Sequence, residues 1–290
     1  MNNMVNYLLI DGSYYIFYRF HALKKYWDFR DDKPPLGDDP FSNIDFKEQY
    51  IKVFITKINE IKKKLKLKDC KILIAKDCPR NNIWRNDFIK EYKSNREITK
   101  GIGDFFKIVY DDDLFIKAGA ECILEYPRLE ADDCKALFVK NLKEKESNIT
   151  IITNDADYLQ LQNENVNIVA LNYKNLNASK NSFKDPKKDL FCKIVKGDKS
   201  DNIPGIFKKC GIKTCEKLYD DNDLFLEKLE KENATELYKL NNLIIDFDNI
   251  PSELSYKFLK KYENLIGIDS DNDSENDSEN DSENKNIEMI

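Results

Sequence analysis

The sequence has few of the residues that bind transition metals. Among its 290 residues there is one histidine, His21, and the seven cysteines form no C-x-x-C pair. A structural zinc site needs four nitrogen or sulfur ligands with characteristic spacing, and no such set is present. Any metal must therefore be bound by oxygen atoms, which favours magnesium, manganese or calcium.

Two further signatures are missing. No apolar run is long enough to span a bilayer, and residues 1–7 lack the basic segment that precedes the apolar part of a signal peptide. The glycine-rich loop with Lys-Ser or Lys-Thr that marks P-loop nucleotide-binding enzymes is also absent. We therefore expect a soluble, intracellular and monomeric protein without a membrane anchor.

Charge is abundant but unevenly distributed. Residues 269–290 carry nine acids and one lysine, largely as Asp-Ser-Glu-Asn repeats, which predicts a disordered acidic tail. The whole chain has 47 basic and 53 acidic residues, so without the tail these numbers become 46 and 44. The rest of the chain is thus slightly basic, which is compatible with a polyanionic partner.

Acidic residues follow closely after apolar runs. Val5–Ile10, Lys71–Ala75 and Ile149–Thr153 are each typical of a buried strand, and an acid comes next or two residues later. Because such strands alternate with amphipathic helices to about residue 175, residues 1–183 are predicted to form an α/β domain with a largely parallel sheet. The carboxyl ends of parallel strands lie at one edge of the sheet, where sites form. The acids should gather there.

The segment Leu129–Asp133 brings three more acids to the start of a predicted helix, Cys134–Asn141. Negative charge is favoured at a helix N-terminus, so a capping-rich helix start is one interpretation of this segment alone. On a helix the three carboxylates can also point into one volume. With two acids in a later turn, the predicted metal ligands are Asp11, Asp77, Glu130, Asp132, Asp133, Asp155, Asp157, Asp198 and Asp201.

Nine carboxylates are too many for simple acid–base catalysis, since a glycosidase needs only two. Two divalent ions about 3.5 to 4 Å apart would neutralise them, and would also activate water and stabilise the leaving oxygen in a phosphoryl displacement. We therefore predict phosphodiester hydrolysis with two Mg²⁺ ions, for which Mn²⁺ substitutes.

Basic and aromatic residues interleave between residues 80 and 96. On a helical wheel they form an aromatic stripe beside a cationic one, made of Trp84, Phe88 and Tyr92 with Arg85, Lys93 and Arg96. This pairing suits phosphates and unstacked bases, although an aromatic stripe at this spacing is as typical of a packed core.

The residues after about 183 are predicted to be helical. Within them, Gly197–Gly205 is rich in turn-forming residues and predicts a hairpin between two helices, whose backbone N–H groups can bind a phosphate. We expect residues 184–268 to form a helical domain that binds DNA.

Six sequence blocks occur in the order and spacing of the flap endonuclease and 5′-nuclease family, namely Asp11–Ser13, Asp77, Glu91–Arg96, Leu129–Asp133, Thr153–Asp157 and Gly197–Gly205. The chain resembles this family, which includes the 5′-to-3′ exonuclease domain of bacterial DNA polymerase I. Within the family, Trp84–Arg96 and Leu243–Pro251 look most like segments of the ribonuclease H of T-even phages.

The resemblance implies a PIN-like nuclease domain followed by a helix-hairpin-helix domain. It implies cleavage near the 5′ end of DNA flaps, nicked duplexes or RNA–DNA hybrids, in primer removal or repair. The nine acids match the family's metal site, and residues 78–118 match an arch over it. Lys93 and Arg96 match the basic residues that act on the scissile phosphate, and the expected nucleic-acid contacts are Arg85, Tyr92, Lys93, Arg96, Asn202 and Gly205.

Some features depart from the family pattern. Lys208 stands where many members have glycine, which argues against a monovalent ion in the hairpin, and residues 286–290 lack the aromatic pair that binds a sliding clamp. Two alternatives remain. A PIN-class ribonuclease would lack the hairpin and the helices after it. An inactive nucleic-acid-binding relative would have lost acids, and none of the nine is missing.

Overall fold

The computed structural model describes residues 5–96, 99–142, 147–179 and 182–267, so the predicted tail at 269–290 lies outside the described residues. At the centre is a five-stranded sheet in the order β3-β2-β1-β4-β5, with every neighbouring pair parallel. The strands are β1 (Asn6–Asp11), β2 (Cys70–Ala75), β3 (Cys122–Leu124), β4 (Asn148–Ile152) and β5 (Val166–Val169). The predicted parallel sheet is confirmed.

The central strand β1 is apolar throughout because both faces of the sheet are covered. Leu8 and Ile10 belong to one hydrophobic core, whereas Tyr7 and Leu9 belong to another on the opposite face. Successive side chains of a strand point to opposite faces, so a strand buried on both sides shows a continuous apolar run.

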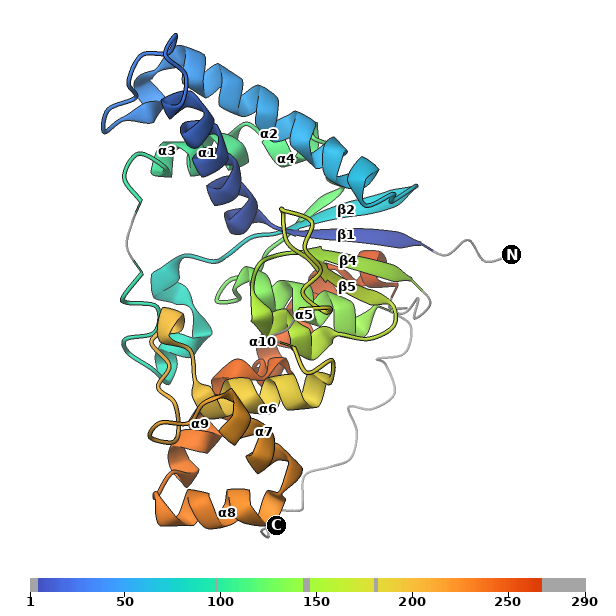
Figure 1. Ribbon diagram of the computed structural model, residues 1–290. Helices are drawn as coiled ribbons and strands as arrows, with labels where there is room; N and C mark the ends of the chain where they lie inside the picture. The colour runs from blue at the N-terminus through green and yellow to red at the C-terminus, as the bar shows by residue number, and fades with distance from the viewer. Residues whose placement is uncertain (1–4, 97–98, 143–146, 180–181, 268–290) are drawn as a thin grey trace.

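Helices pack on both faces of this sheet (Figure 1). One face is covered by α1 (Gly12–Asp28), α2 (Ile44–Lys64), α3 (Gly103–Asp111) and α4 (Leu114–Lys117). The other face is covered by α5 (Ala131–Asn141), α10 (Ser252–Lys261) and α11 (Glu263–Ile266). Among the described helices, none combines the length and the apolar character that crossing a membrane requires.

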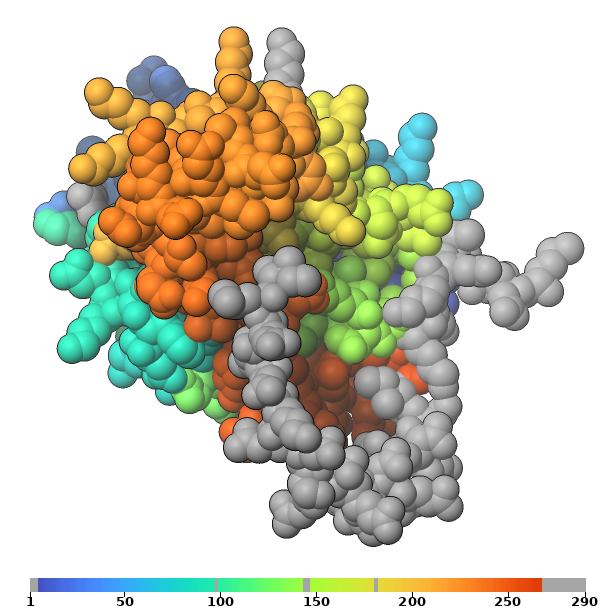
Figure 2. All heavy atoms as spheres, turned by 90° about the horizontal axis from the view of Figure 1, so that it is seen from below, coloured from blue at the N-terminus to red at the C-terminus, as the bar shows by residue number. Residues whose placement is uncertain are grey.

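The remaining helices form a lobe with a core of its own, which protrudes from the sheet (Figures 1 and 2). They are α6 (Pro186–Lys196), α7 (Ile212–Asp220), α8 (Asn222–Lys231) and α9 (Thr235–Ile245). After this lobe the chain returns to the sheet, because Phe258, Tyr262 and Ile266 pack in the core around α5. The domain division at residue 184 stays a prediction, and the last two helices of the predicted second domain pack on the first.

Residues 80–96 do not form the helix assumed for their aromatic and cationic stripes. They contain two short 3-10 helices, η2 (Arg80–Asn82) and η3 (Trp84–Asp87), followed by turns. Backbone N–H groups that an α-helix would use internally donate elsewhere, from Trp84 to the carbonyl of Arg128 and from Lys93 to the carbonyl of Asp201. Tertiary contacts therefore determine this conformation.

Other 3-10 helices interrupt the connections. They are η1 (Pro40–Ser42), η4 (Ala156–Leu161), η5 (Lys199–Asp201) and η6 (Phe247–Asn249).

The hairpin between α6 and α7 depends on Gly197, whose φ is +65° and whose Cβ, if present, would lie 2.5 Å from the Ile203 carbonyl oxygen. The turn is closed by a pair of backbone hydrogen bonds between Asp198 and Ile203, at 2.9 and 2.7 Å. A side chain at position 197 would open it.

Candidate metal centre

Five acids meet at the carboxyl edge of the sheet. Asp11 is the last residue of β1, Asp77 lies two residues beyond β2, and Asp155 and Asp157 follow β4. Asp132 joins them from the first turn of α5. We call these five residues the front acids.

The front acids act on one another electrostatically. Burial raises the pKa of Asp77, and the nearby carboxylates of Asp11 and Asp132 raise it further. Burial likewise raises the pKa of Asp155 well above its usual value, with Asp157 and Asp132 adding to the effect. Like charges shift a pKa this way only at close range. The front acids therefore lie near enough to influence one another at this edge of the sheet, where the strand-end pattern predicts them.

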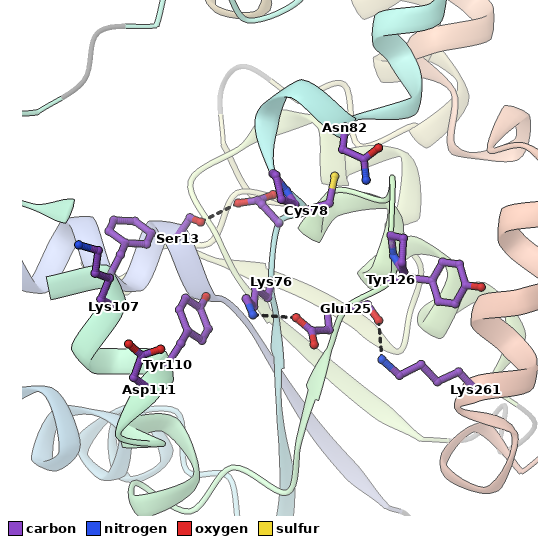
Figure 3. A pocket seen from close by; sticks show the side chains of 14 residues that line it. Ser13, Lys76, Cys78, Asn82, Lys107, Tyr110, Asp111, Glu125, Tyr126 and Lys261 are labelled. Atoms are coloured by element: carbon purple, nitrogen blue, oxygen red, sulfur yellow. Dashed lines mark hydrogen bonds and ion pairs between the residues drawn. The ribbon is translucent and has the colours of Figure 1, made fainter. Parts of the chain in front are cut away.

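Asp11 and Asp77 are held by donors of the chain. The Asp11 carboxylate accepts the Tyr14 N–H at 2.8 Å, which caps α1, and it accepts the Lys135 ammonium at 2.8 Å. The Asp77 carboxylate accepts the Ser13 hydroxyl at 2.6 Å (Figure 3) and the Ala131 N–H at 2.9 Å. These contacts fix where the two side chains point.

Asp132 and Asp157 each face a cation. Asp132 accepts the Tyr158 hydroxyl at 2.5 Å, and although burial opposes it, the charge of Lys135 helps to lower the pKa of Asp132. The Lys193 ammonium lies 2.5 Å from both Asp157 and Asp198. Burial still raises the pKa of Asp157, since Lys193 offsets only part of the desolvation.

The other two acids of the Leu129–Asp133 segment lie on a different side. Asp133 is fully buried, and its carboxylate accepts both Arg85 Nη atoms, at 2.9 and 2.8 Å, and Trp84 Nε1 at 3.0 Å. Arg85 Nη1 also lies 2.9 Å from Glu130, and the Glu130 N–H donates to Asp133 at 3.0 Å in a capping box. We call Glu130 and Asp133 the rear acids.

This network changes the interpretation of Arg85. From the sequence, Arg85 is expected to contact nucleic acid, but in the structure it is 3% exposed and also donates to the Ile244 carbonyl at 2.7 Å. Its guanidinium is used up by buried partners inside the protein, so it does not reach a phosphate in this structure. Arg85 instead ties the rear acids to α9.

Lys93, Tyr92 and Arg96 surround the remaining acids. The Lys93 ammonium pairs with Glu130 and lies 3.6 Å from Asp201, and Arg96 pairs with the other oxygen of Asp201. Tyr92 donates to Glu130 at 3.0 Å and is 6% exposed, so its ring is buried and not available for stacking on a base in this structure. The catalytic roles of Lys93 and Arg96 stay predictions.

The hairpin is docked against residues 91–96. Asp198 caps η5 by accepting the N–H and hydroxyl of Ser200, and these bonds, with that from Lys193, overcome burial and lower the pKa of Asp198 to about 2. Asn202 donates to the Glu91 carbonyl at 3.1 Å. Gly205 packs so closely that a Cβ would lie 2.8 Å from the Lys196 carbonyl oxygen. Their predicted contacts with nucleic acid stay predictions.

Several residues of the site were missed in the sequence. Lys135 and Lys193 stand among the acids, and Trp84, Tyr158 and Ser13 donate to them. Lys135 gives a signal, because it lies three residues after Asp132 in a helix whose neighbouring positions are buried. Ser13 and Trp84 belong to motifs noted in the sequence, but no sequence pattern links Ser13, Trp84 or Tyr158 to its acid, because each reaches that acid from a distant part of the chain.

Within the described ranges, no group of three or more acidic, histidine or cysteine side chains is arranged ready to hold a metal ion. Ammonium groups lie between pairs of acids instead. Lys193 joins Asp157 to Asp198, and Lys93 joins Glu130 to Asp201. The chain's own cations thus neutralise part of the acidic cluster.

A cavity of about 770 Å³ adjoins the front acids on the side of Asp77 (Figure 3). Aromatic rings and lysines line it together, and its wall includes Phe106, Tyr110, Tyr126, Lys107 and Lys261. Such a combination suits the base and the phosphate of a nucleotide. Its lining comes from the ends of β2 and β3 and from α3, and it includes Asp77.

Comparison with known proteins gives one consistent family. A family model described as the 5′-3′ exonuclease N-terminal resolvase-like domain matches residues 6–188. The 5′-3′ exonuclease of Buchnera aphidicola subsp. Schizaphis graminum is 32% identical over 213 residues, which cover 66% of this chain and 68% of that protein. Ribonuclease H of Enterobacteria phage T4 is 28% identical over 226 residues, covering 70% and 73%.

The fold has solved counterparts. The bacteriophage T5 D15 flap endonuclease, in a pseudo-enzyme-product complex with DNA and metal ions, superposes with a TM-score of 0.64 at 17% identity, covering 90% of this chain and 99% of that one. This likeness supports the arrangement of sheet and helices. Because the family model matches residues 6–188, more than half of the chain, the chain belongs to the 5′-3′ exonuclease family.

Proposed function

We propose that this chain is a divalent-metal-dependent 5′ nuclease that hydrolyses phosphodiester bonds near the 5′ end of flaps, nicked duplexes or RNA–DNA hybrids. The observation that carries the proposal is the convergence of the front acids at the carboxyl edge of the sheet, with Lys93 and Arg96 close by. The expected cofactor is Mg²⁺, as two ions, and Mn²⁺ substitutes for it.

The residues present fit such ions. The front acids offer only oxygen atoms, the ligands that hard divalent cations prefer. Burial and neighbouring carboxylates raise the pKa of Asp77 and Asp155, so these acids repel one another when ionised, and a divalent cation would offset this repulsion. When bound, the ions would polarise the scissile phosphate and activate water.

The ligands are drawn from the front acids together with Asp198. Lys193 now lies between Asp157 and Asp198, and its side chain is 21% exposed. We infer that the Lys193 side chain turns toward solvent when an ion takes its place, since this side chain is already partly exposed. No ion replaces the cation at Asp133, because the Asp133 carboxylate is fully buried against Arg85 and Trp84.

Lys93 and Arg96 neutralise the scissile phosphate. Both cations are now paired with Asp201, and Arg96 is 42% exposed. A phosphate entering the site would compete with these carboxylates for the same donors. Cations aimed at the place where charge develops contribute most in the transition state.

The helical lobe is proposed to bind the duplex through the hairpin between α6 and α7, with Asn202 and Gly205 in its turn. The T5 flap endonuclease with the same fold is known in a complex with DNA, which supports this placement. The presence of α6 to α9 also argues against a PIN-class ribonuclease, which would lack them. An arch formed by residues 78–118 remains part of the proposal.

The test is cleavage of three labelled substrates: a 5′ flap, a nicked duplex and an RNA–DNA hybrid. Each is incubated with Mg²⁺, with Mn²⁺ and with a chelator, and Asp155→Asn serves as the inactive control. We expect metal-dependent release of short 5′ fragments from at least the flap. Equal cleavage in chelator, or equal activity of the control, would contradict the proposal.

A further inference from the structure

Lys135 is a fully buried lysine inside the acidic cluster. Its relative exposure is 0%, and it extends from α5 toward the carboxyl end of β1, where its ammonium lies 2.8 Å from an oxygen of Asp11. The ammonium also lies 4.4 Å from the centre of the Tyr158 ring. An isolated buried ammonium is very costly, and these two contacts offset part of that cost.

Two other cations of the cluster are partly open to solvent, whereas Lys135, like Arg85, is enclosed. The side chain of Lys193 is 21% exposed and that of Arg96 is 42% exposed, whereas that of Lys135 is 0% exposed. A divalent ion can displace an ammonium that turns into water. Displacing Lys135 would leave its charge in the protein interior, because the whole residue is 0% exposed and lies among the buried positions of α5.

We propose that Lys135 permanently supplies the positive charge beside Asp11, so that Asp11 holds the lysine and does not bind a divalent ion. Both carboxylate oxygens of Asp11 and of Asp77 accept hydrogen bonds, but the donors to Asp77 are neutral, whereas Asp11 accepts one bond from the buried ammonium of Lys135. The proposed ligands of the divalent ions are then the remaining front acids, Asp77, Asp132, Asp155 and Asp157, together with Asp198. This inference rests on the proposed metal-dependent function and refines its ligand set.

The proposal makes Lys135 a residue that weakens metal binding. Its charge lies near Asp132, whose pKa it helps to lower, so a divalent ion at Asp132 is repelled by a fixed unit charge. Removing that charge frees Asp11 as a ligand and removes the repulsion. Asp11→Asn alone, in contrast, removes a carboxylate that no ion uses.

The experiment measures Mn²⁺ binding to the substrate-free protein by titration calorimetry and by the electron paramagnetic resonance of free Mn²⁺. The variants are Asp11→Asn, Lys135→Met, the double variant and Asp132→Asn. Lys140→Met, on the outer part of the same helix, is the control for the loss of one positive charge. Thermal unfolding without metal is recorded for each variant, because Asp11→Asn leaves the buried ammonium without its anion.

We expect Asp11→Asn to lower the Mn²⁺ affinity by clearly less than Asp132→Asn does, because it removes no metal ligand and only leaves the Lys135 charge unbalanced, and we expect it to lower the unfolding temperature. Lys135→Met should raise the affinity about tenfold, and Asp11→Asn in that background should cancel the gain, whereas Lys140→Met should change little. The proposal is overturned if Asp11→Asn lowers the affinity as much as Asp132→Asn does. If Lys135→Met does not fold, the comparison of Asp11→Asn with Asp132→Asn decides alone.

These outcomes are distinct from failure of the proposed function. If the wild type binds no Mn²⁺ and cleaves nothing, the metal-dependent nuclease is wrong. If the wild type binds Mn²⁺ and cleaves, but Asp11→Asn loses both as Asp132→Asn does, then only the role given to Lys135 fails.

Discussion

Asp132 and Asp133 are neighbours in the sequence and have opposite surroundings. Asp132 faces other carboxylates at the edge of the sheet, and its contacts are a tyrosine hydroxyl and the charge of Lys135. Asp133 is enclosed by Arg85 and Trp84, and both of its carboxylate oxygens accept hydrogen bonds from these two side chains. One helical turn thus directs one acid to the front of the cluster and the next to the rear.

The difference separates two tasks that the same residue type performs. Among the front acids, Asp77 and Asp155 are raised in pKa by neighbouring carboxylates and gain from an added cation, whereas the rear acids already pair with Arg85. An acid whose charge is balanced inside the protein stabilises the fold, and an acid whose charge is not balanced is ready to bind a ligand. Substitutions at the front should therefore affect chemistry, and substitutions at the rear should affect folding.

The largest effect is expected from Asp132→Asn. Losing one metal ligand should slow cleavage by about a thousandfold or more, since metal stabilisation of the transition state amounts to several kcal/mol. Affinity for duplex DNA should stay within a few-fold, because the basic surface is unchanged. Single-turnover cleavage and equilibrium binding, with the exposed Asp248→Asn as control, measure both. Full activity in Mg²⁺ would remove Asp132 from the site.

Arg85→Ala tests the rear of the cluster. It leaves Asp133 and Glu130 buried without their main cation, and removing one partner of a buried ion pair costs about 3 to 5 kcal/mol. We expect a clear loss in the free energy of unfolding, measured by urea denaturation. Arg96→Ala is the matched control, because that arginine is 42% exposed and should cost little stability. Equal losses in the free energy of unfolding for Arg85→Ala and Arg96→Ala would contradict the distinction between front and rear acids.

Lys93→Ala should slow the chemical step by about a hundredfold, because a cation beside the scissile phosphate contributes most where charge develops. Its effect on binding should be smaller, since the ground state makes less use of this charge. The comparison is between single-turnover rate and flap affinity. Equal losses in the two would make Lys93 an ordinary phosphate contact.

A smaller effect concerns stability and pH in the absence of metal. The pKa of Asp155 is raised above its ordinary value of 3.8, so the folded state holds this proton more tightly than the unfolded state does. The folded state therefore loses stability as pH rises from about 3.8 to the raised pKa. Asp155→Asn should therefore unfold a few degrees higher than the wild type at pH 7, with the gap closing toward pH 4.

Asp198→Asn provides a control of opposite sign. The pKa of Asp198 is lowered to about 2, so its stabilising contribution is complete above its ordinary value of 3.8 and is lost as pH falls toward 2. This variant should be less stable than the wild type at pH 7. Thermal melts across a pH series in chelator measure both variants, and a common sign for the two would contradict the assignment.

Much of this arrangement could be predicted from the sequence. Apolar runs ending in acids predict parallel strands that deliver carboxylates to one edge, and Asp11, Asp77, Asp155 and Asp157 lie there. The start of α5 at Glu130 was also predictable, because three acids precede an apolar helix. These features depend on local pattern, which the sequence displays directly.

The division between front and rear acids could not be predicted. It depends on Arg85, which reaches Asp133 from 48 residues away and lies in a segment whose spacing suggested a helix. The helical wheel failed there because the N–H groups of Trp84 and Lys93 bond to distant carbonyls. Contacts of this kind arise only when the fold brings separate segments together.

Thermal unfolding of Asp132→Asn and Asp133→Asn, with and without Mg²⁺, tests the central claim most directly. A bound ion raises the unfolding temperature by mass action, so the gain in Mg²⁺ reports the metal site. We predict that Asp133→Asn unfolds at a lower temperature without metal yet keeps the gain of the wild type. Asp132→Asn should lose less stability without metal than Asp133→Asn does, and it should lose most of the rise in unfolding temperature that Mg²⁺ causes. If Asp133→Asn instead loses the gain and keeps its metal-free stability, the two acids have the opposite roles and the account is wrong.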